Sequence, residues 1–136
     1  MSNDFMQITR GPIVTFLRER GYEKLTPIQA QTLPVILEGK DVIAESPTGS
    51  GKTMAYLLPL VQNLDETKKE LQVLVLAPTQ ELVMQIYREA TQLLASIGMH
   101  AAALIGGVDA KRQLDKLKTH PAIVIGPPGR VKELLE

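Results

Sequence analysis

The 136-residue sequence predicts an α/β domain with a parallel sheet that is covered by helices on both faces. Short, almost wholly apolar runs of strand length alternate with longer segments of helical spacing, which is typical of strands buried on both faces. Each run is followed within three residues by glycine or proline, so each strand is expected to end in a turn. At 44% hydrophobic residues, the chain can bury a core of this kind.

Two helices are expected in residues 1–40. The first follows a Gly-Pro pair and ends at Gly21. The second begins at Thr26, a good N-cap, with Pro27 at the first helical position. Pro34 lies inside the second helix and should kink it or mark a weak turn.

Residues 41–136 are predicted to form four β-α units. The expected strands are residues 41–44, 73–77, 101–105 and 122–125, and the expected helices are residues 51–63, 79–97, 110–118 and 130–136. Ligands of parallel sheets bind beyond the carboxyl ends of the strands. The unusual residues of this chain lie there: a Gly-rich loop, Pro78-Thr79, Gly106-Gly107 and residues 127–130.

Composition excludes several classes of protein. The chain has no cysteine, so it forms no disulfide or thiolate zinc site, and its two histidines, His100 and His120, are too far apart in sequence to suggest a metal site. No apolar run approaches the roughly 20 residues of a membrane span, and the N-terminus lacks the pattern of a secretory signal, so a cytoplasmic protein is expected. Fifteen basic residues balance fifteen acidic ones, so any nucleic acid must be bound through a few placed groups.

A phosphate-binding loop is predicted after the first expected strand. It consists of Ser46, Pro47, Thr48, Gly49, Ser50, Gly51, Lys52 and Thr53. Backbone N–H groups of such a loop converge on phosphate oxygens, and the helix that follows adds its partial positive charge. Lys52 would reach the β- and γ-phosphates, and the Thr53 hydroxyl would hold Mg²⁺. The alternative is a Gly- and Ser-rich turn followed by Lys-Thr by chance.

Gln29 precedes Lys52 by 23 residues and is a candidate reader of the nucleobase. A glutamine amide bonds adenine at two points, donating to N7 and accepting from the N6 amine, whereas guanine presents a different pattern. On its own, the segment is also explained as an ordinary helix start.

Five segments in order resemble the motifs of the DEAD-box RNA helicases. Residues 21–29 resemble the Q motif, with Phe5 as its upstream aromatic residue, and residues 46–53 resemble motif I. Residues 78–82 resemble motif Ia, Gly106-Gly107 resembles the GG motif, and residues 126–130 resemble motif Ib. The resemblance covers nearly the whole chain, and it implies a RecA-like first helicase domain.

The resemblance also implies roles for individual residues. Adenine nucleotide would be bound by Tyr22, Thr26, Gln29 and residues 46–53, with Lys52 and Thr53 serving catalysis. The RNA backbone would be faced by Pro78, Thr79, Gln80, Gly106, Gly107, Gly129 and Arg130, without sequence specificity. ATP, Mg²⁺ and RNA are therefore the expected ligands.

Two residues of the RNA-binding motifs depart from the family pattern: Gln80 replaces an arginine, and Pro127 replaces a threonine. Both changes remove a charge or a donor, which indicates either weaker RNA binding or compensation elsewhere. The alternative is that Gln80 still donates to phosphate and Pro127 only stiffens the loop. Ser46 is a milder departure in motif I, where alanine is common. The Asp-Glu pair that ATP hydrolysis requires is not found after any apolar strand.

We therefore expect residues 1–136 to be the N-terminal part of the first helicase domain of an RNA helicase. The fold would be incomplete at its C-terminus, the piece inactive alone, and its exposed sheet edge prone to self-association. Two alternatives remain: a degenerate helicase domain that binds a protein partner, and a P-loop NTPase with no RNA role.

Overall fold

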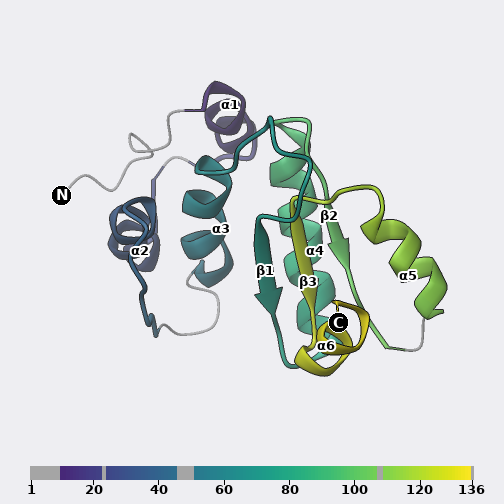
Figure 1. Cartoon of the computed structure of the whole chain (residues 1–136). Coiled ribbons are helices and arrows are strands. Elements are labelled where there is room, and N and C mark those ends of the chain that lie inside the picture. Colours follow the sequence, from purple (N-terminus) through teal and green to yellow (C-terminus); the bar gives the residue numbers. More distant parts are fainter. Residues whose placement is uncertain (1–9, 23, 46–50, 107–108, 136) are drawn as a thin grey trace. The chain divides into compact units, whose positions relative to one another are not determined.

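The computed structural model describes residues 10–22, 24–45, 51–106 and 109–135. The chain divides into two compact units, Met1–Leu64 and Asp65–Glu136. Helices α1 to α3 belong to the first unit, and a sheet with helices α4 to α6 belongs to the second (Figure 1). In the part of the chain so described, no helix is long and apolar enough to cross a membrane.

The first unit contains α1 (Gly11–Glu19), α2 (Pro27–Leu37) and α3 (Lys52–Gln62). α1 buries Ile13 and Leu17 on one face. α2 packs against α3, and at their contact the buried Thr32 hydroxyl donates to the Ala55 carbonyl oxygen at 2.6 Å. This bond satisfies a polar group that would otherwise destabilise the contact.

α2 does not end at Pro34, which lies inside it, and continues to Leu37. α3 likewise contains Pro59. Each proline removes one helical N–H, so packing of the two helices must stabilise them beyond their intrinsic propensity.

The second unit is built on three parallel strands in the order β1-β3-β2. The strands are β1 (Val73–Leu76), β2 (Ala101–Ala103) and β3 (Ile123–Gly126). Ile123 pairs with Val73 of β1 on one side and with Ala101 of β2 on the other. Every residue of the central strand is buried, as expected for a strand covered on both faces.

Helices cover the two faces of this sheet. α4 (Gln80–Ala95) contacts β2 and β3 and lies behind them in Figure 1. On the other face, α5 (Ala110–Leu117) and α6 (Pro128–Leu135) pack over the core cluster. The cluster consists of Ala102, Leu104, Val124, Val131 and Leu134, with Ala110 and Leu117 against it. The predicted α/β fold with a parallel sheet is confirmed.

The prediction of a strand over residues 41–44 is wrong. The structure contains three strands within the described residues, and this run is not among them. Val42 is exposed, and Ile43 is 96% exposed. A strand is defined by ladder hydrogen bonds to a neighbour, and an apolar run without a paired neighbour has none.

The other elements agree with the sequence within a few residues. β2 ends at Ala103 instead of residue 105, although the Leu104 N–H still donates to the Ile125 carbonyl oxygen at 2.8 Å. α6 begins at Pro128, two residues earlier than expected, because proline suits the first turn of a helix.

Candidate functional site

The amide of Gln29 lies between the start of α2 and the start of α3. Its oxygen accepts from the Thr26 backbone N–H at 3.0 Å, and the Thr26 hydroxyl accepts from the Gln29 backbone N–H at 3.5 Å, which completes a capping box. Its Nε2 group donates to the Gly51 carbonyl oxygen at 3.2 Å. The side chain is only 3% exposed, so these contacts hold it in one arrangement.

Gly51 is the residue on which this contact depends. Its φ of +85° is a left-handed conformation that glycine adopts without strain. A Cβ atom at this position would lie 2.5 Å from Gln29 Nε2 and 3.0 Å from the Thr26 hydroxyl oxygen. The glycine therefore serves both the turn into α3 and the close approach of the amide.

Lys52 and Thr53 occupy the first turn of α3, directly after this glycine. The Lys52 side chain is exposed, and Thr53 is half-buried. A helix N-terminus attracts anions because its first N–H groups have no partner within the helix. Residues 46–50, which complete the predicted phosphate loop, and Phe5 lie outside the described residues.

The predicted Mg²⁺ position depends on a single side chain. Thr53 offers one hydroxyl oxygen, and the described residues contain no group of three or more His, Cys, Asp or Glu suited to a metal. This donor set fits Mg²⁺ held mainly by phosphate oxygens and water, which is the usual coordination of this ion at nucleotides.

A pocket of about 280 Å³ opens beside α2 and α3 in the same unit. Its walls are mainly apolar and include Ile28, Ile36 and Val42, with Lys52 among the lining residues. Neither Gln29 nor Tyr22 lines it. The Tyr22 side chain is exposed to solvent. The two residues predicted to read the base and to stack on it therefore lie outside the lining of this pocket.

The second unit brings the predicted RNA-binding residues to one edge of the sheet. Pro78, Thr79 and Gln80 follow β1, Gly106 follows β2, and Gly129 follows β3, and all five residues are exposed. Because the strands are parallel, their carboxyl ends lie at the same edge, at the bottom of the sheet in Figure 1. Gly107 lies outside the described residues.

Thr79 is already engaged at this edge. Its hydroxyl accepts from the Leu82 N–H at 3.1 Å and caps α4. The same hydroxyl retains its own proton as a donor.

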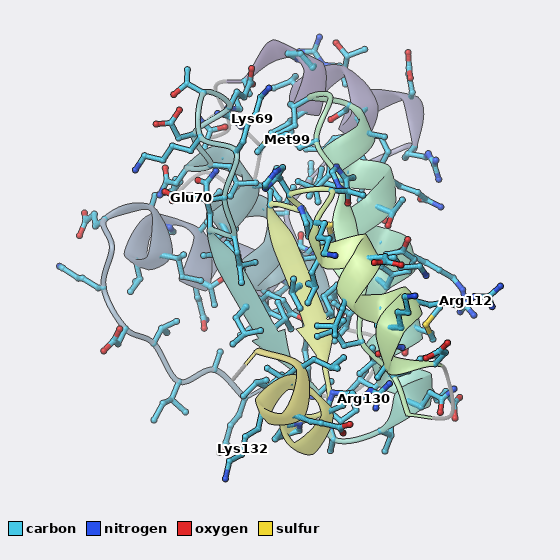
Figure 2. All side chains as sticks on the ribbon, turned by 45° about the vertical axis from the view of Figure 1, so that its right-hand side comes forward. Lys69, Glu70, Met99, Arg112, Arg130 and Lys132 are labelled. Atoms are coloured by element: carbon cyan, nitrogen blue, oxygen red, sulfur yellow. The ribbon has the colours of Figure 1, made fainter. Side chains whose placement is uncertain are left out.

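Arg130 differs from the other predicted RNA contacts because its side chain is only 14% exposed. Its Nε donates to the Gln113 Oε1 at 3.0 Å, and one terminal nitrogen pairs with Glu133 at 3.2 Å. Figure 2 shows Arg130 at the lower edge of the sheet, whereas Arg112 and Lys132 point outward.

Gln113 is a residue that sequence reasoning missed. It is one of the few buried polar residues described, whereas the neighbouring Leu114 is exposed. The signal was present in the spacing, because Gln113 shares a helical face with Ala110 and Leu117, both of which pack on the core.

Comparison with known proteins identifies the family. The family model of the DEAD/DEAH box helicases matches residues 26–136. The chain belongs to the DEAD/DEAH box helicase family. The predicted resemblance is thereby confirmed.

The relatives of this helicase chain include two from Bacillus. The DEAD-box ATP-dependent RNA helicase CshC of Bacillus cereus is 56% identical over 115 residues, which cover 85% of this chain and 30% of the relative. The probable ATP-dependent RNA helicase YfmL of Bacillus subtilis is 50% identical over 116 residues, covering 85% and 31%. The helicase chain thus spans about a third of the length of these relatives.

Two solved structures resemble the helicase chain and support its RecA-like architecture. A hypothetical ATP-dependent RNA helicase from Sulfolobus tokodaii gives a TM-score of 0.83 at 31% identity, covering 93% of this chain and 36% of that one. The RNA helicase Prp28 from Chaetomium thermophilum, bound to ADP, gives 0.85 at 32% identity, covering 98% and 34%.

Proposed function

We propose that the protein is a cytoplasmic ATP-dependent RNA helicase of the DEAD-box type, whose adenine-nucleotide site lies at the starts of α2 and α3. Family membership and the names of the relatives support the class. The observation that carries the site is the Gln29 amide, which contacts Gly51 directly before Lys52. The proposed base reader, Gln29, thus lies against the residue that precedes the proposed phosphate-binding Lys52, although Gln29 and Lys52 are 23 residues apart in sequence.

The described hydrogen bonds of Gln29 use only part of its amide, which supports the proposal that it reads adenine. A glutamine amide has two N–H donors and an oxygen with two lone pairs. One N–H donates to the Gly51 carbonyl oxygen, and one lone pair accepts from the Thr26 N–H. The described contacts therefore use one of the two donors and one of the two lone pairs of the amide. The second donor suits adenine N7, and the second lone pair suits the N6 amine.

Lys52 and residues 46–51 would bind the phosphates, and Thr53 would contribute one ligand to Mg²⁺. The metal would neutralise charge on the phosphate oxygens when bound. RNA would run along the carboxyl edge of the sheet in the second unit, where its phosphates meet Thr79, Gly106 and Gly129.

The proposal is tested by comparing ADP and GDP binding to the chain by calorimetry. ADP should bind more tightly, and Gln29→Ala should remove most of the preference, on the order of 1–3 kcal/mol for a two-point base contact. Gln31→Ala is the matched control, because it makes the same change at an exposed position of the same helix. Equal affinities for ADP and GDP in the unaltered chain would contradict the assignment.

Two alternatives predict different results. A degenerate domain that binds a protein partner predicts no nucleotide binding and no effect of Lys52→Ala on any ligand. A P-loop NTPase without an RNA role predicts ADP binding but no affinity for single-stranded RNA.

A further inference from the structure

The buried amide of Gln113 connects the ends of two neighbouring strands in the second unit. Its Nε2 donates to the Ile105 carbonyl oxygen at 2.8 Å, and its Oε1 accepts from Arg130 Nε at 3.0 Å. Ile105 directly precedes Gly106 in the loop after β2, and Arg130 follows Gly129 in the first turns of α6 after β3. One side chain of α5 is therefore bonded both to the loop after β2, which carries the exposed Gly106, and to the first turn of α6, which carries the exposed Gly129.

Packing alone does not explain a glutamine at this position. Gln113 is 1% exposed and lies on the face of α5 that covers an apolar cluster. A buried amide is stabilising only when its donors and acceptor are bonded, and a leucine or methionine would bury more apolar surface there. What the amide adds is two hydrogen bonds of defined direction, which fix the positions of Ile105 and Arg130 relative to each other.

The surrounding backbone is closely packed. A Cβ atom on Gly126 would lie 2.8 Å from Val131 Cγ2 and 2.9 Å from the Leu104 carbonyl oxygen. The Leu104 N–H donates to the Ile125 carbonyl oxygen at 2.8 Å. The ends of β2 and β3 and the start of α6 thus lie close together, and Gln113 bonds the adjoining residues in two of these segments, Ile105 and Arg130.

We propose that Gln113 and Arg130 are positioning residues that hold the loop after β2 and the first turn of α6 at a set separation for the ribose-phosphate backbone of single-stranded RNA. Arg130 acts through this bridge, since its Nε is bonded to Gln113 and its side chain is largely buried. Neighbouring phosphates of a strand have a defined spacing, so these two segments bind them together only at a matching separation. This inference rests on the proposed RNA-binding function.

The decisive variants are Gln113→Leu and Gln113→Glu in the whole chain. Leucine removes both bonds, whereas glutamate retains an oxygen for Arg130 and sets its other oxygen against the Ile105 carbonyl. The probe is an oligouridylate of about ten nucleotides, a length that covers a typical single-strand site. We expect Gln113→Leu to weaken binding of this oligonucleotide about tenfold. This is the effect of losing about one hydrogen bond to a charged phosphate when the two segments are no longer held in place. Gln113→Glu should lose less of its affinity for the oligonucleotide than Gln113→Leu does.

Two further measurements separate positioning from a general loss of stability. The Arg130 Nε–H signal in NMR spectra should be protected from solvent exchange in the unaltered chain and in Gln113→Glu, and should lose that protection in Gln113→Leu. ADP would bind in the first unit, so ADP affinity should stay within about twofold in both variants. Gln85→Leu, at an exposed position of α4, is the control and should change neither RNA affinity nor the Arg130 signal. The double variant Gln113→Leu, Arg130→Leu should bind RNA no more weakly than Gln113→Leu alone.

The inference is overturned if Gln113→Leu loses the protected Arg130 signal and still binds RNA as the unaltered chain does. It is also overturned if the losses from Gln113→Leu and Arg130→Leu multiply in the double variant, because residues acting through one bridge cannot be independent. An unaltered chain that binds no RNA would instead overturn the RNA-binding function itself, and this outcome is visible before any variant is made.

Discussion

Two residues at the carboxyl edge of the sheet illustrate how similar sequence positions acquire different roles. Gln80 and Arg130 both follow a strand, and both fall in segments that resemble RNA-binding motifs. Gln80 is exposed, whereas the Arg130 guanidinium is bonded to Gln113 and Glu133. The exposed position 80 could therefore carry a cation, and the motif Ia pattern that this segment resembles has arginine there.

Gln80→Arg is expected to strengthen RNA binding. An added arginine that reaches a phosphate releases a counterion, so the plot of log affinity against log salt should steepen by about 0.7 for a single strand. Affinity at low salt should rise severalfold, as measured by fluorescence anisotropy with an oligouridylate. Gln85→Arg adds the same charge at an exposed position farther along α4, and equal gains from the two variants would show that only net charge had changed.

Among the helices that the structure describes, α4 buries two polar side-chain atoms that lack hydrogen bonds. Glu89 Oε2 and Thr91 Oγ1 are buried and have no hydrogen-bond partner among the described residues. Desolvation by burial raises the pKa of the Glu89 carboxyl above its usual value. The folded chain therefore binds the Glu89 proton more tightly than the unfolded chain does.

This difference sets the sign of a pH effect on stability. Stability contributed at Glu89 should fall as the pH rises from the usual carboxyl range through the raised pKa, because the folded state must then bury a charge. Glu89→Gln should therefore be more stable than the unaltered chain at neutral pH, by less than about 1 kcal/mol because the group is only half-buried. The gain should vanish below about pH 4, where Glu89 is protonated in both the folded and the unfolded chain.

Urea unfolding at several pH values checks this expectation. Glu81→Gln, in the exposed first turn of the same helix, is the control and should show no such gain. A gain from Glu89→Gln that is the same at pH 4 and pH 7 would mean that the effect is not electrostatic.

The elements also show what the sequence could and could not predict. Helices were located within a few residues because capping, proline and glycine signals act over short distances, as at Thr26 and Gly51. The strand expected at residues 41–44 failed because pairing depends on a neighbour that local spacing does not specify. Gln113 was missed because residue type suggested exposure, whereas its place on the buried face of α5 depends on the loops it bridges.

On the scale of the whole molecule, the sheet has an open edge at β1. Among the described strands, β1 pairs with β3 on one side and with no strand on the other. Register places Leu74 and Leu76 on the same face as Val124 and Gly126. They remain 46% and 53% exposed.

An open edge with exposed leucines favours pairing between copies of the chain. We expect the chain to self-associate at high concentration, as measured by sedimentation velocity. Replacing both residues, Leu74→Lys and Leu76→Lys, should shift it toward monomer because charged edges repel and remain hydrated. Leu114→Lys, at an equally apolar exposed position on α5, is the control. Association that survives the edge changes would locate the interface elsewhere.

The two bonds to the Gln29 amide would have a consequence for the proposed choice of adenine over guanine. Adenine carries a donor at position 6 and guanine an acceptor, so a carboxamide that turned over, exchanging nitrogen and oxygen, would offer guanine O6 a partner. Turning over is opposed here, because it would set the amide NH₂ against the Thr26 N–H and the amide oxygen against the Gly51 carbonyl. The main chain at two helix starts would thereby fix the orientation that excludes guanine. Loosening the turn at Gly51 should erode that exclusion before it weakens the binding of adenine.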